Sequence, residues 1–359
     1  MPHPTDLTAL GFTGRWPALL DLVRDDLDPA TAATAVAGRI IRADRGAATA
    51  RTADDSHRII WTPATEPPVT GDWVLLDPTA GVLLGIAPRA TALTRPRTTK
   101  RPDASGQQVL AANMDLVGVL AGVEDDLNVR RLERALVMAY ESGATPLVIL
   151  TKIDLIDDRT IPLAQARATA VGVDVLPVSP VTGEGMADLA DRLAPDRTIA
   201  LLGASGAGKS TLTNALVGSE VLQTGAVRAV DGRGRHTTTH RELVTLPTGG
   251  AVLDTPGLRS LSLGVVEEGM DQAFPEISEL AGACRFNDCR HDEEPGCAVT
   301  AALDDGRLDG DRFEGWRRIR AASESAALRA DIAAYRAEAR SWGRVYREAQ
   351  ALRRDREGR

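Results

Sequence analysis

Short apolar runs alternate with polar segments along the chain, and the spacing of these runs changes at two places. Between about residues 36 and 93 the runs are brief, and Gly, Pro and Asp punctuate them. This pattern is typical of a small β-barrel or sandwich, and an OB-like barrel fits the length. Strands are expected at residues 36–41, 57–61, 72–76 and 82–86. A helical piece is expected before them, near residues 16–27.

From about residue 109 the pattern becomes the strand–helix alternation of a doubly wound α/β domain with a mainly parallel sheet. After about residue 265 no strand is expected, and a helical tail rich in Ala, Arg and Glu begins near Asp311. The pattern thus divides the chain into five parts: a leader at 1–35, a barrel at 36–98, a linker at 99–108, an α/β domain at 109–268 and a helical domain at 269–359.

Composition and charge narrow the class of protein. The 359 residues suffice for two or three domains. No apolar run approaches the ~18 residues of a membrane span, and the first residues lack the form of a secretory signal. We therefore expect a cytoplasmic protein without membrane attachment. The net charge of −8 argues against a uniformly basic nucleic-acid binder. Basic stretches at 89–101 and 311–359 could contact phosphate backbones, or could be a linker and a solvated helix face.

A Gly-rich turn between a predicted strand and a predicted helix has the spacing of a phosphate-binding P-loop. Its glycines let backbone N–H groups point at the β-phosphate, and its lysine can reach the β and γ oxygens. Its serine hydroxyl can bind Mg²⁺. The N-terminus of the following helix is the positive end of the helix dipole and favours a phosphate there. The nucleotide-binding candidates here are Gly203, Ala204, Ser205, Gly206, Ala207, Gly208, Lys209, Ser210 and Thr211.

Two further motifs complete a nucleotide site. Asp254 ends a predicted apolar strand after the P-loop and can hold Mg²⁺, and the Gly257 N–H is placed to meet the γ-phosphate. The second is a candidate guanine-recognition motif, called here the guanine reader, which consists of Thr151, Lys152 and Asp154. The Asp154 carboxylate can accept from the N1–H and the exocyclic amine of guanine, which adenine does not offer. The stem of Lys152 would lie over the base.

Two positions depart from the usual guanine site. Thr151 stands where Asn is commoner, which we expect to cost one supporting hydrogen bond. Ser179 belongs to the site, but Pro180 follows it where a Ser-Ala pair usually gives a backbone N–H to guanine O6. Because proline has no N–H, either another donor takes over or O6 is read poorly.

The order of the motifs is also unusual, since the guanine reader precedes the P-loop. The sequence therefore predicts a circularly permuted P-loop GTPase domain. Leu258 occupies the position where Ras-type enzymes place a water-orienting Gln, so slow intrinsic turnover is expected. His236 is the nearest substitute that could orient or deprotonate a water, and His240 is a second choice. Residues 232–239 are a candidate switch loop, with a flexible basic loop as the alternative.

The cysteines of the chain all lie in one short segment near a histidine. Three thiolates and one imidazole make a full tetrahedral Cys₃His set that is closed to substrate, which predicts one structural zinc ion. Three unrelated buried thiols are the less favoured alternative. The expected ligands are Cys284, Cys289, His291 and Cys297.

Together these motifs resemble the RsgA family of ribosome small-subunit-dependent GTPases. The resemblance rests on the guanine reader and on the strings at 112–115, 232–239, 254–259 and 284–298, and it runs from about residue 36 to 316. It implies an N-terminal OB barrel, a permuted GTPase domain and a C-terminal α-helical zinc domain. It also implies a late maturation factor that binds the 30S subunit and its rRNA, and whose hydrolysis of GTP to GDP that subunit stimulates. We expect the protein to be a monomer. His236 would then be catalytic, and Thr238 would bind magnesium.

Two other functions stay open on the sequence. One is an ATP-using P-loop enzyme, such as a kinase or a transporter-type ATPase, which Asp154 argues against. The other is a non-catalytic RNA-binding scaffold in which the nucleotide acts only as a switch. Hydrolysis assays with and without ribosomes would distinguish this scaffold from an enzyme.

Overall fold

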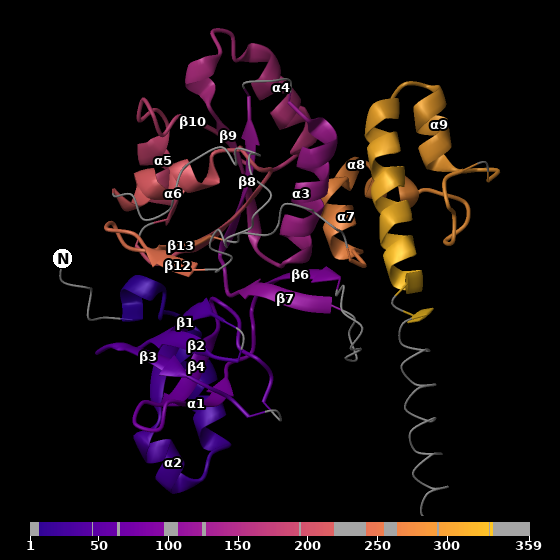
Figure 1. The fold of residues 1–359 in the computed structure, drawn as a ribbon. Coiled ribbons are helices and arrows are strands. Elements are labelled where there is room, and N and C mark those ends of the chain that lie inside the picture. Colours follow the sequence, from indigo (N-terminus) through magenta and orange to yellow (C-terminus); the bar gives the residue numbers. More distant parts are fainter. Residues whose placement is uncertain are drawn as a thin grey trace, which may run out of the picture.

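The computed structural model describes most of the chain as a mixed α/β protein with three successive groups of elements (Figure 1). A small N-terminal sheet, drawn in indigo, adjoins a central α/β unit, and a helical C-terminal group lies beside helix α3. Among the described residues, no helix is long and apolar enough to cross a membrane. The described residues are 7–44, 46–62, 65–96, 107–123, 127–193, 195–218, 242–254, 264–292, 294–329 and 331–332.

The leader folds against the N-terminal sheet. Its elements are a 3-10 helix η1 (Leu7–Leu10), α1 (Trp16–Asp25) and α2 (Pro29–Thr34). Helix α1 lies within the helical piece expected near residues 16–27. The rings of Phe12 and Trp16 lie 4.9 Å and 6.0 Å from the ring of Trp73, which is fully buried. Through these contacts the leader packs against the strand that contains Trp73.

Five strands form a closed circuit of pairings. They are β1 (Val36–Ala43), β2 (Ala48–Arg51), β3 (Ser56–Ile59), β4 (Trp73–Asp77) and β5 (Val82–Ile86). Strand β1 pairs antiparallel with β2 and β4, β2 pairs with β3, and β4 pairs with β5. A parallel bridge from Ile60 to Val82 joins the ends of the circuit. These pairings make a small barrel, and its assignment as an OB-like fold stays a prediction.

A two-stranded hairpin leads from the barrel to the α/β unit. Its strands are β6 (Ala92–Pro96) and β7 (Gln107–Ala112), which pair antiparallel. The linker predicted at 99–108 overlaps this hairpin, because Gln107 and Gln108 begin β7. Residues 99–106 lie outside the described part of the chain.

The central sheet confirms the predicted doubly wound α/β fold. Its strands are β8 (Leu116–Gly122), β9 (Thr145–Thr151), β10 (Val175–Val178), β11 (Thr198–Gly203), β12 (Glu242–Thr245) and β13 (Ala251–Asp254). They run in the order β10-β9-β8-β11-β13-β12, and all are parallel except β12. Strand β12 also pairs with β1 through Glu242 and Arg42. The barrel and the α/β unit therefore share one continuous hydrogen-bonded sheet.

Helices cover both faces of this sheet. They are α3 (Val129–Glu141), α4 (Thr160–Thr169), α5 (Met186–Leu193) and α6 (Lys209–Val217). Alternate residues of β9 face opposite sides: Val148 packs in the core that contains α3, and Ile149 packs in the core that contains α5 and α6. The α3 helix begins after Asn128, whose side chain accepts from the Arg131 N–H and caps the first turn.

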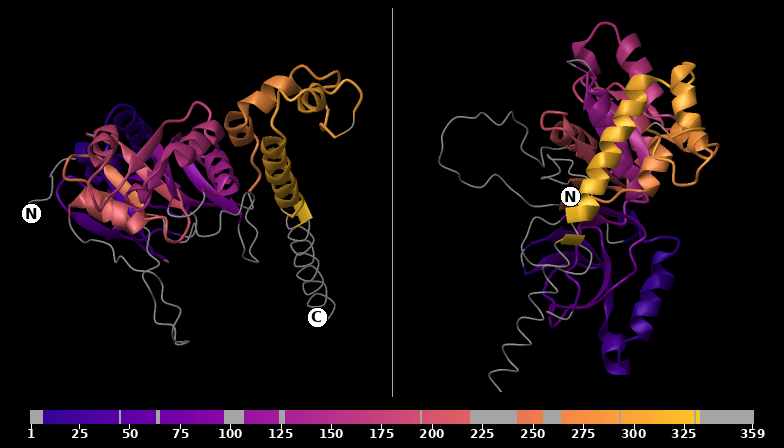
Figure 2. Two further views of the ribbon diagram at one scale, coloured as in Figure 1. Left: turned by 90° about the horizontal axis from the view of Figure 1, so that it is seen from above. Right: turned by 90° about the vertical axis from the view of Figure 1, so that its right-hand side faces the viewer.

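The C-terminal part is helical, as predicted. It contains α7 (Glu268–Ala273), α8 (Pro275–Ala281), α9 (Ala298–Asp304) and a longer helix over residues 310–329. Figure 2 shows the long helix beside the α/β unit, with the turn that leads into α9 on its outer side. Phe313 and Trp316 of the long helix stack at 5.6 Å in the core that this group shares with α3.

Candidate nucleotide site and metal centre

Three loops of the predicted nucleotide site meet at the carboxyl edge of the parallel sheet. Thr151, the last residue of β9, pairs with Val178, the last residue of β10. Gly203, the last residue of β11, pairs with Leu120 of β8. Ligands of open α/β sheets bind outside the carboxyl ends of the strands. The guanine reader, the loop that begins at Ser179 and the P-loop are thus brought to one edge.

The P-loop has the backbone geometry that its sequence predicts. Gly206 and Gly208 have φ of +83° and +82°, in the left-handed region that glycine adopts without strain. Helix α6 begins immediately afterwards, at Lys209. The Lys209 ammonium donates to the carbonyls of Gly203 and Ala204, both at 2.7 Å. Ser210 and Thr211 follow in the first turn of α6, where N–H groups and the helix dipole favour an anion.

Thr151 ties the guanine reader to the P-loop. Its side chain is buried, and its hydroxyl donates to the Ala207 carbonyl at 3.0 Å. The Ala121 carbonyl at the end of β8 lies 3.4 Å from the same hydroxyl. The hydrogen bond expected to be lost at Thr151 is therefore replaced by a direct bond between the two loops. Sequence reasoning missed this bond because its partners are 56 residues apart.

The remaining reader residues follow Thr151 in a tight turn. Lys152 has a left-handed backbone with φ of +63°, and Asp154 lies exposed in the 3-10 helix η2 (Ile153–Leu155). An exposed carboxylate at the edge of the sheet can receive the N–H groups of a base. Ser179 is fully buried, and its hydroxyl accepts from the Thr182 N–H at 3.2 Å. Its side chain therefore shapes the second base-reading loop.

The structure leaves several predicted residues untested. The backbone of Asp254 pairs with Glu242 at the end of β13, next to β11 and the P-loop. This places Asp254 at the carboxyl edge, as a magnesium ligand requires. His236, Thr238 and Gly257 lie outside the described residues, so their roles stay predictions.

The predicted zinc ligands come together in the C-terminal part. The potential ligand atoms of Cys284, Cys289, His291 and Cys297 all lie within 4.8 Å of one another. The sulfurs of Cys284 and Cys297 are 3.9 Å apart, and they lie 3.6 Å and 3.5 Å from His291 Nδ1. Zn–S bonds of about 2.3 Å and Zn–N bonds of about 2.0 Å give tetrahedral edges of roughly 3.5–3.8 Å. These four residues therefore could hold a zinc ion.

The surroundings of this group suit a metal. Burial and the Arg320 guanidinium lower the pKa of His291, so its ring is neutral and can offer a lone pair at pH 7. The sulfurs of Cys284 and Cys297 accept backbone N–H groups from Ala298 and Thr300, both at 3.4 Å. Such donors stabilise thiolates. The centre has the closed ligand set of a structural site.

Sequence reasoning missed Arg39, which joins three parts of the molecule. The side chain is buried in β1 and lies 5.0 Å over the Trp73 ring. Its guanidinium donates to the Leu10 carbonyl, to the Thr198 hydroxyl at 2.8 Å and to the Asn113 carbonyl at 2.7 Å. Burial lowers the pKa of Arg39 to about 10, so the group stays charged at pH 7. The sequence feature that could have pointed to Arg39 is its position as a charged residue inside an otherwise apolar strand.

A second, partly buried arginine joins the C-terminal part to α3. Arg312 donates to Glu133 at 3.0 Å and to Glu276 at 2.6 Å, and it lies 4.1 Å over the Phe274 ring. The Glu133 side chain is only 3% exposed. Burial raises the pKa of Glu133, and the nearby Arg312 opposes that shift. The pair connects the long C-terminal helix to the central unit.

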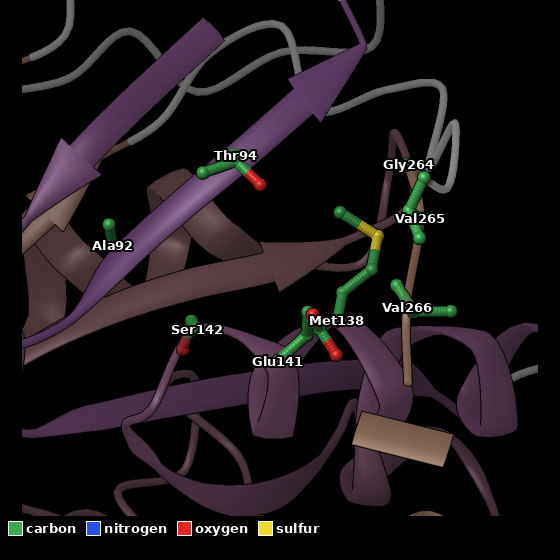
Figure 3. Close-up of a pocket in the computed structure, with 8 residues that line it drawn as sticks. All are labelled: Ala92, Thr94, Met138, Glu141, Ser142, Gly264, Val265 and Val266. Atoms are coloured by element: carbon green, nitrogen blue, oxygen red, sulfur yellow. The ribbon is translucent and has the colours of Figure 1, made fainter. Parts of the chain in front are cut away.

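A small cavity lies at this same junction (Figure 3). It is lined by β6, by the end of α3 and by residues 264–266, and its volume is about 20 Å³. That space fits about one water molecule and excludes a nucleotide. Beside it, the Glu141 carboxylate accepts from the Gly269 N–H at 2.9 Å and so caps α7. The cavity belongs to the junction and not to the nucleotide site.

Comparisons with known proteins agree with this geometry. A family model for the RsgA GTPase matches residues 86–264. The small ribosomal subunit biogenesis GTPase RsgA of Streptomyces coelicolor is 43% identical over 345 residues, which cover 93% of this chain and 91% of that protein. The protein of the same name from Opitutus terrae is 44% identical over 318 residues, which cover 84% and 86% of the two chains.

Solved structures show the same architecture. YjeQ from Thermotoga maritima superposes with a TM-score of 0.58 at 23% identity, covering 79% of this chain and 97% of that one. YloQ, a circularly permuted GTPase, has a TM-score of 0.57 at 26% identity, covering 80% and 95%. The predicted circular permutation is confirmed. With relatives above 40% identity over nine-tenths of its length, this chain belongs to the RsgA family of GTPases.

Proposed function

We propose that this protein hydrolyses GTP to GDP and phosphate and acts in the maturation of the small ribosomal subunit. The observation that carries the nucleotide site is the hydrogen bond from Thr151 to the P-loop carbonyl of Ala207. It joins a guanine reader and a phosphate loop that the chain presents in permuted order. The relatives from Streptomyces coelicolor and Opitutus terrae, 43% and 44% identical to this chain, are named small ribosomal subunit biogenesis GTPases.

Each predicted residue has a place in this activity. The Asp154 carboxylate would receive the N1–H and amine of guanine, and the Lys152 stem would cover the base. The P-loop amides and Lys209 would hold the β- and γ-phosphates. A magnesium ion, held by Ser210 with Thr238 and Asp254, would neutralise phosphate charge, and Gly257 would donate to the γ-phosphate. We assign His236 the orientation of the attacking water, because Leu258 cannot supply it.

The zinc centre has a structural part in this proposal. A filled Cys₃His site leaves no open position for substrate. His291 packs 5.6 Å from the Trp316 ring, so a bound ion would tie the loop of residues 284–297 to the long C-terminal helix. Through Arg312 and Glu133 the same helix contacts α3. Zinc would thereby hold the C-terminal part in a fixed position on the nucleotide-binding unit.

The basic surfaces proposed for rRNA contact need one revision. Arg89 was part of the predicted basic stretch at 89–101, but its guanidinium pairs with Asp72 at 2.8 Å and with Glu66 at 2.5 Å. Its side chain is only 15% exposed, so Arg89 holds the barrel together and is not free for phosphate. Exposed arginines of the long C-terminal helix remain candidates for rRNA contact; one is Arg317, which pairs with Asp292 at the surface but has a side chain that is 51% exposed. With the ribosome as partner, we place the activity in the cytoplasm and expect a monomer.

The proposal is tested by single-turnover GTP hydrolysis with purified 30S subunits, with 50S subunits and without ribosomes. We expect faster hydrolysis with 30S subunits alone, and a loss of that stimulation in His236→Ala at unchanged GDP affinity. Equal rates under all three conditions, together with an unchanged rate in the variant, would show a nucleotide-switched scaffold and not an enzyme. Displacement of labelled GDP by ATP as well as by GTP would show an ATP-using enzyme.

A further inference from the structure

Pro180 removes a backbone donor from the second base-reading loop, and the structure of the loop indicates what replaces it. This inference rests on the proposed guanine site. Because β9 and β10 are adjacent and parallel and end in register at Thr151 and Val178, the residues after them lie side by side. The loop that begins at Ser179 therefore adjoins Lys152 and Asp154.

Hydrogen bonds inside this loop use nearly all of its backbone donors. The Ser179 N–H donates to the Glu184 carbonyl at 2.9 Å, and the Gly183 N–H donates to the Ser179 carbonyl at 2.8 Å. The Thr182 N–H donates to the Ser179 hydroxyl. Pro180 has no N–H. Of the described loop at 179–183, only the Val181 N–H has no hydrogen bond to another protein group.

Val181 lies at the surface of the loop. Its side chain is 78% exposed, the largest value among the exposed large apolar side chains described. Ser179, two residues earlier, is fully buried and anchors the start of the turn. The turn therefore fixes the backbone of Val181 while its side chain makes no core contact. A fixed, unpaired amide is a preorganised hydrogen-bond donor.

A surface ion pair connects this loop to the other base reader. Arg159, which follows η2, pairs with Glu184 at the end of the loop. The hydrogen bond to Glu184 raises the pKa of Arg159, and the guanidinium also interacts electrostatically with the Asp154 carboxylate, which raises that pKa further. Exposed ion pairs contribute little to stability. This pair nevertheless bridges the segment that carries Asp154 and the segment that carries Val181.

We propose that the backbone N–H of Val181 donates to guanine O6 and takes the role that residue 180 cannot perform. Pro180 then has a positive effect, because it fixes φ near −65° at the start of the turn and limits the conformations of the next peptide. Guanine is recognised by Asp154 at its N1–H and amine and by Val181 at its O6. The chain thus reads O6 through the residue after the usual one.

The test compares GDP with 6-thio-GDP, in which a larger sulfur that accepts hydrogen bonds more weakly replaces O6. The wild-type protein is expected to bind GDP about threefold to tenfold more tightly, the range of one net hydrogen bond. The valine α-hydroxy acid at position 181 replaces the amide N–H with an ester oxygen. In that variant we expect the preference for GDP to fall to about one. The same ester at exposed Val171, in the turn after α4, is the matched control and should keep the preference.

Two side-chain variants complete the test. Val181→Ala keeps the N–H and should keep the preference for GDP over 6-thio-GDP. Pro180→Ala, combined with the ester at position 181, supplies an N–H at the usual position and should restore the preference. A wild-type preference that survives the ester at 181 overturns the inference. Absence of GDP binding by the wild-type protein would contradict the nucleotide site itself, which is a different result.

Discussion

The hydrogen bond from Thr151 to the P-loop gives the sharpest test of the nucleotide site. Thr151→Val removes the hydroxyl and keeps the shape of the side chain, which is 1% exposed. The Ala207 carbonyl then loses the donor that lies 3.0 Å away. No other part of the guanine reader changes. The substitution therefore isolates the contact between the base-reading and phosphate-binding loops.

The expected effect follows from the burial of this bond. A buried carbonyl that loses its partner costs roughly 1–3 kcal/mol. In the nucleotide-free variant the P-loop can move so that the Ala207 carbonyl is no longer buried without a partner. Binding of a nucleotide then has to bring the P-loop back to the phosphate-binding position, and this lowers the affinity. About 1.4 kcal/mol corresponds to a factor of ten in Kd. We expect Thr151→Val to weaken GDP binding about tenfold.

The assay is calorimetric titration of GDP into each variant, together with urea unfolding. Thr169→Val is the matched control, because the buried Thr169 hydroxyl also donates to a backbone carbonyl, that of Gln165 at 2.8 Å within α4. It should lower the free energy of unfolding and leave the GDP affinity unchanged. If Thr151→Val binds GDP as tightly as the wild type, the bond does not organise the site and the reasoning fails.

Three further predictions concern the connections between parts. Arg312→Met leaves Glu133 buried without its cation and should lower the free energy of unfolding, measured in urea, by about 3–5 kcal/mol. Adding Glu133→Gln to this variant should recover much of the loss. Losses that add fully in the double variant would refute the pairing. Arg39→Met removes the donors shared by the leader, the barrel and β11, and should change Trp73 fluorescence and lower stability by about 2–4 kcal/mol; an unchanged urea midpoint would contradict this role. Cys297→Ser should reduce bound zinc, measured by atomic absorption, from one ion to well below one, with an earlier thermal transition; full zinc content would show another ligand set.

Local patterns in the sequence were enough to predict much of the site. The P-loop, the guanine reader and the cysteine cluster are each continuous short motifs whose chemistry depends on neighbours in the chain. The alternation of strands and helices also predicted a doubly wound α/β domain with a mainly parallel sheet.

Features that depend on distant pairings could not be predicted in this way. Arg39 and Thr198 are 159 residues apart, and Arg312 and Glu133 are 179 apart, so no local pattern connects them. The β6–β7 hairpin brackets a polar, Pro-containing segment that read as a linker. In the sequence Arg89 was interpreted as part of a basic stretch that could contact phosphate, because its partner Asp72 can be identified only in the folded barrel.

The central claim is that permuted loops at one sheet edge hold a guanine nucleotide. Its most direct test is calorimetry of the zinc-loaded protein in magnesium buffer with GDP, GTP and ATP. The structure predicts one binding site for GDP and GTP per chain and no measurable heat with ATP at the same concentrations. Equal binding of ATP would contradict guanine reading by Asp154, and no heat with any of the three nucleotides would contradict the site as a whole.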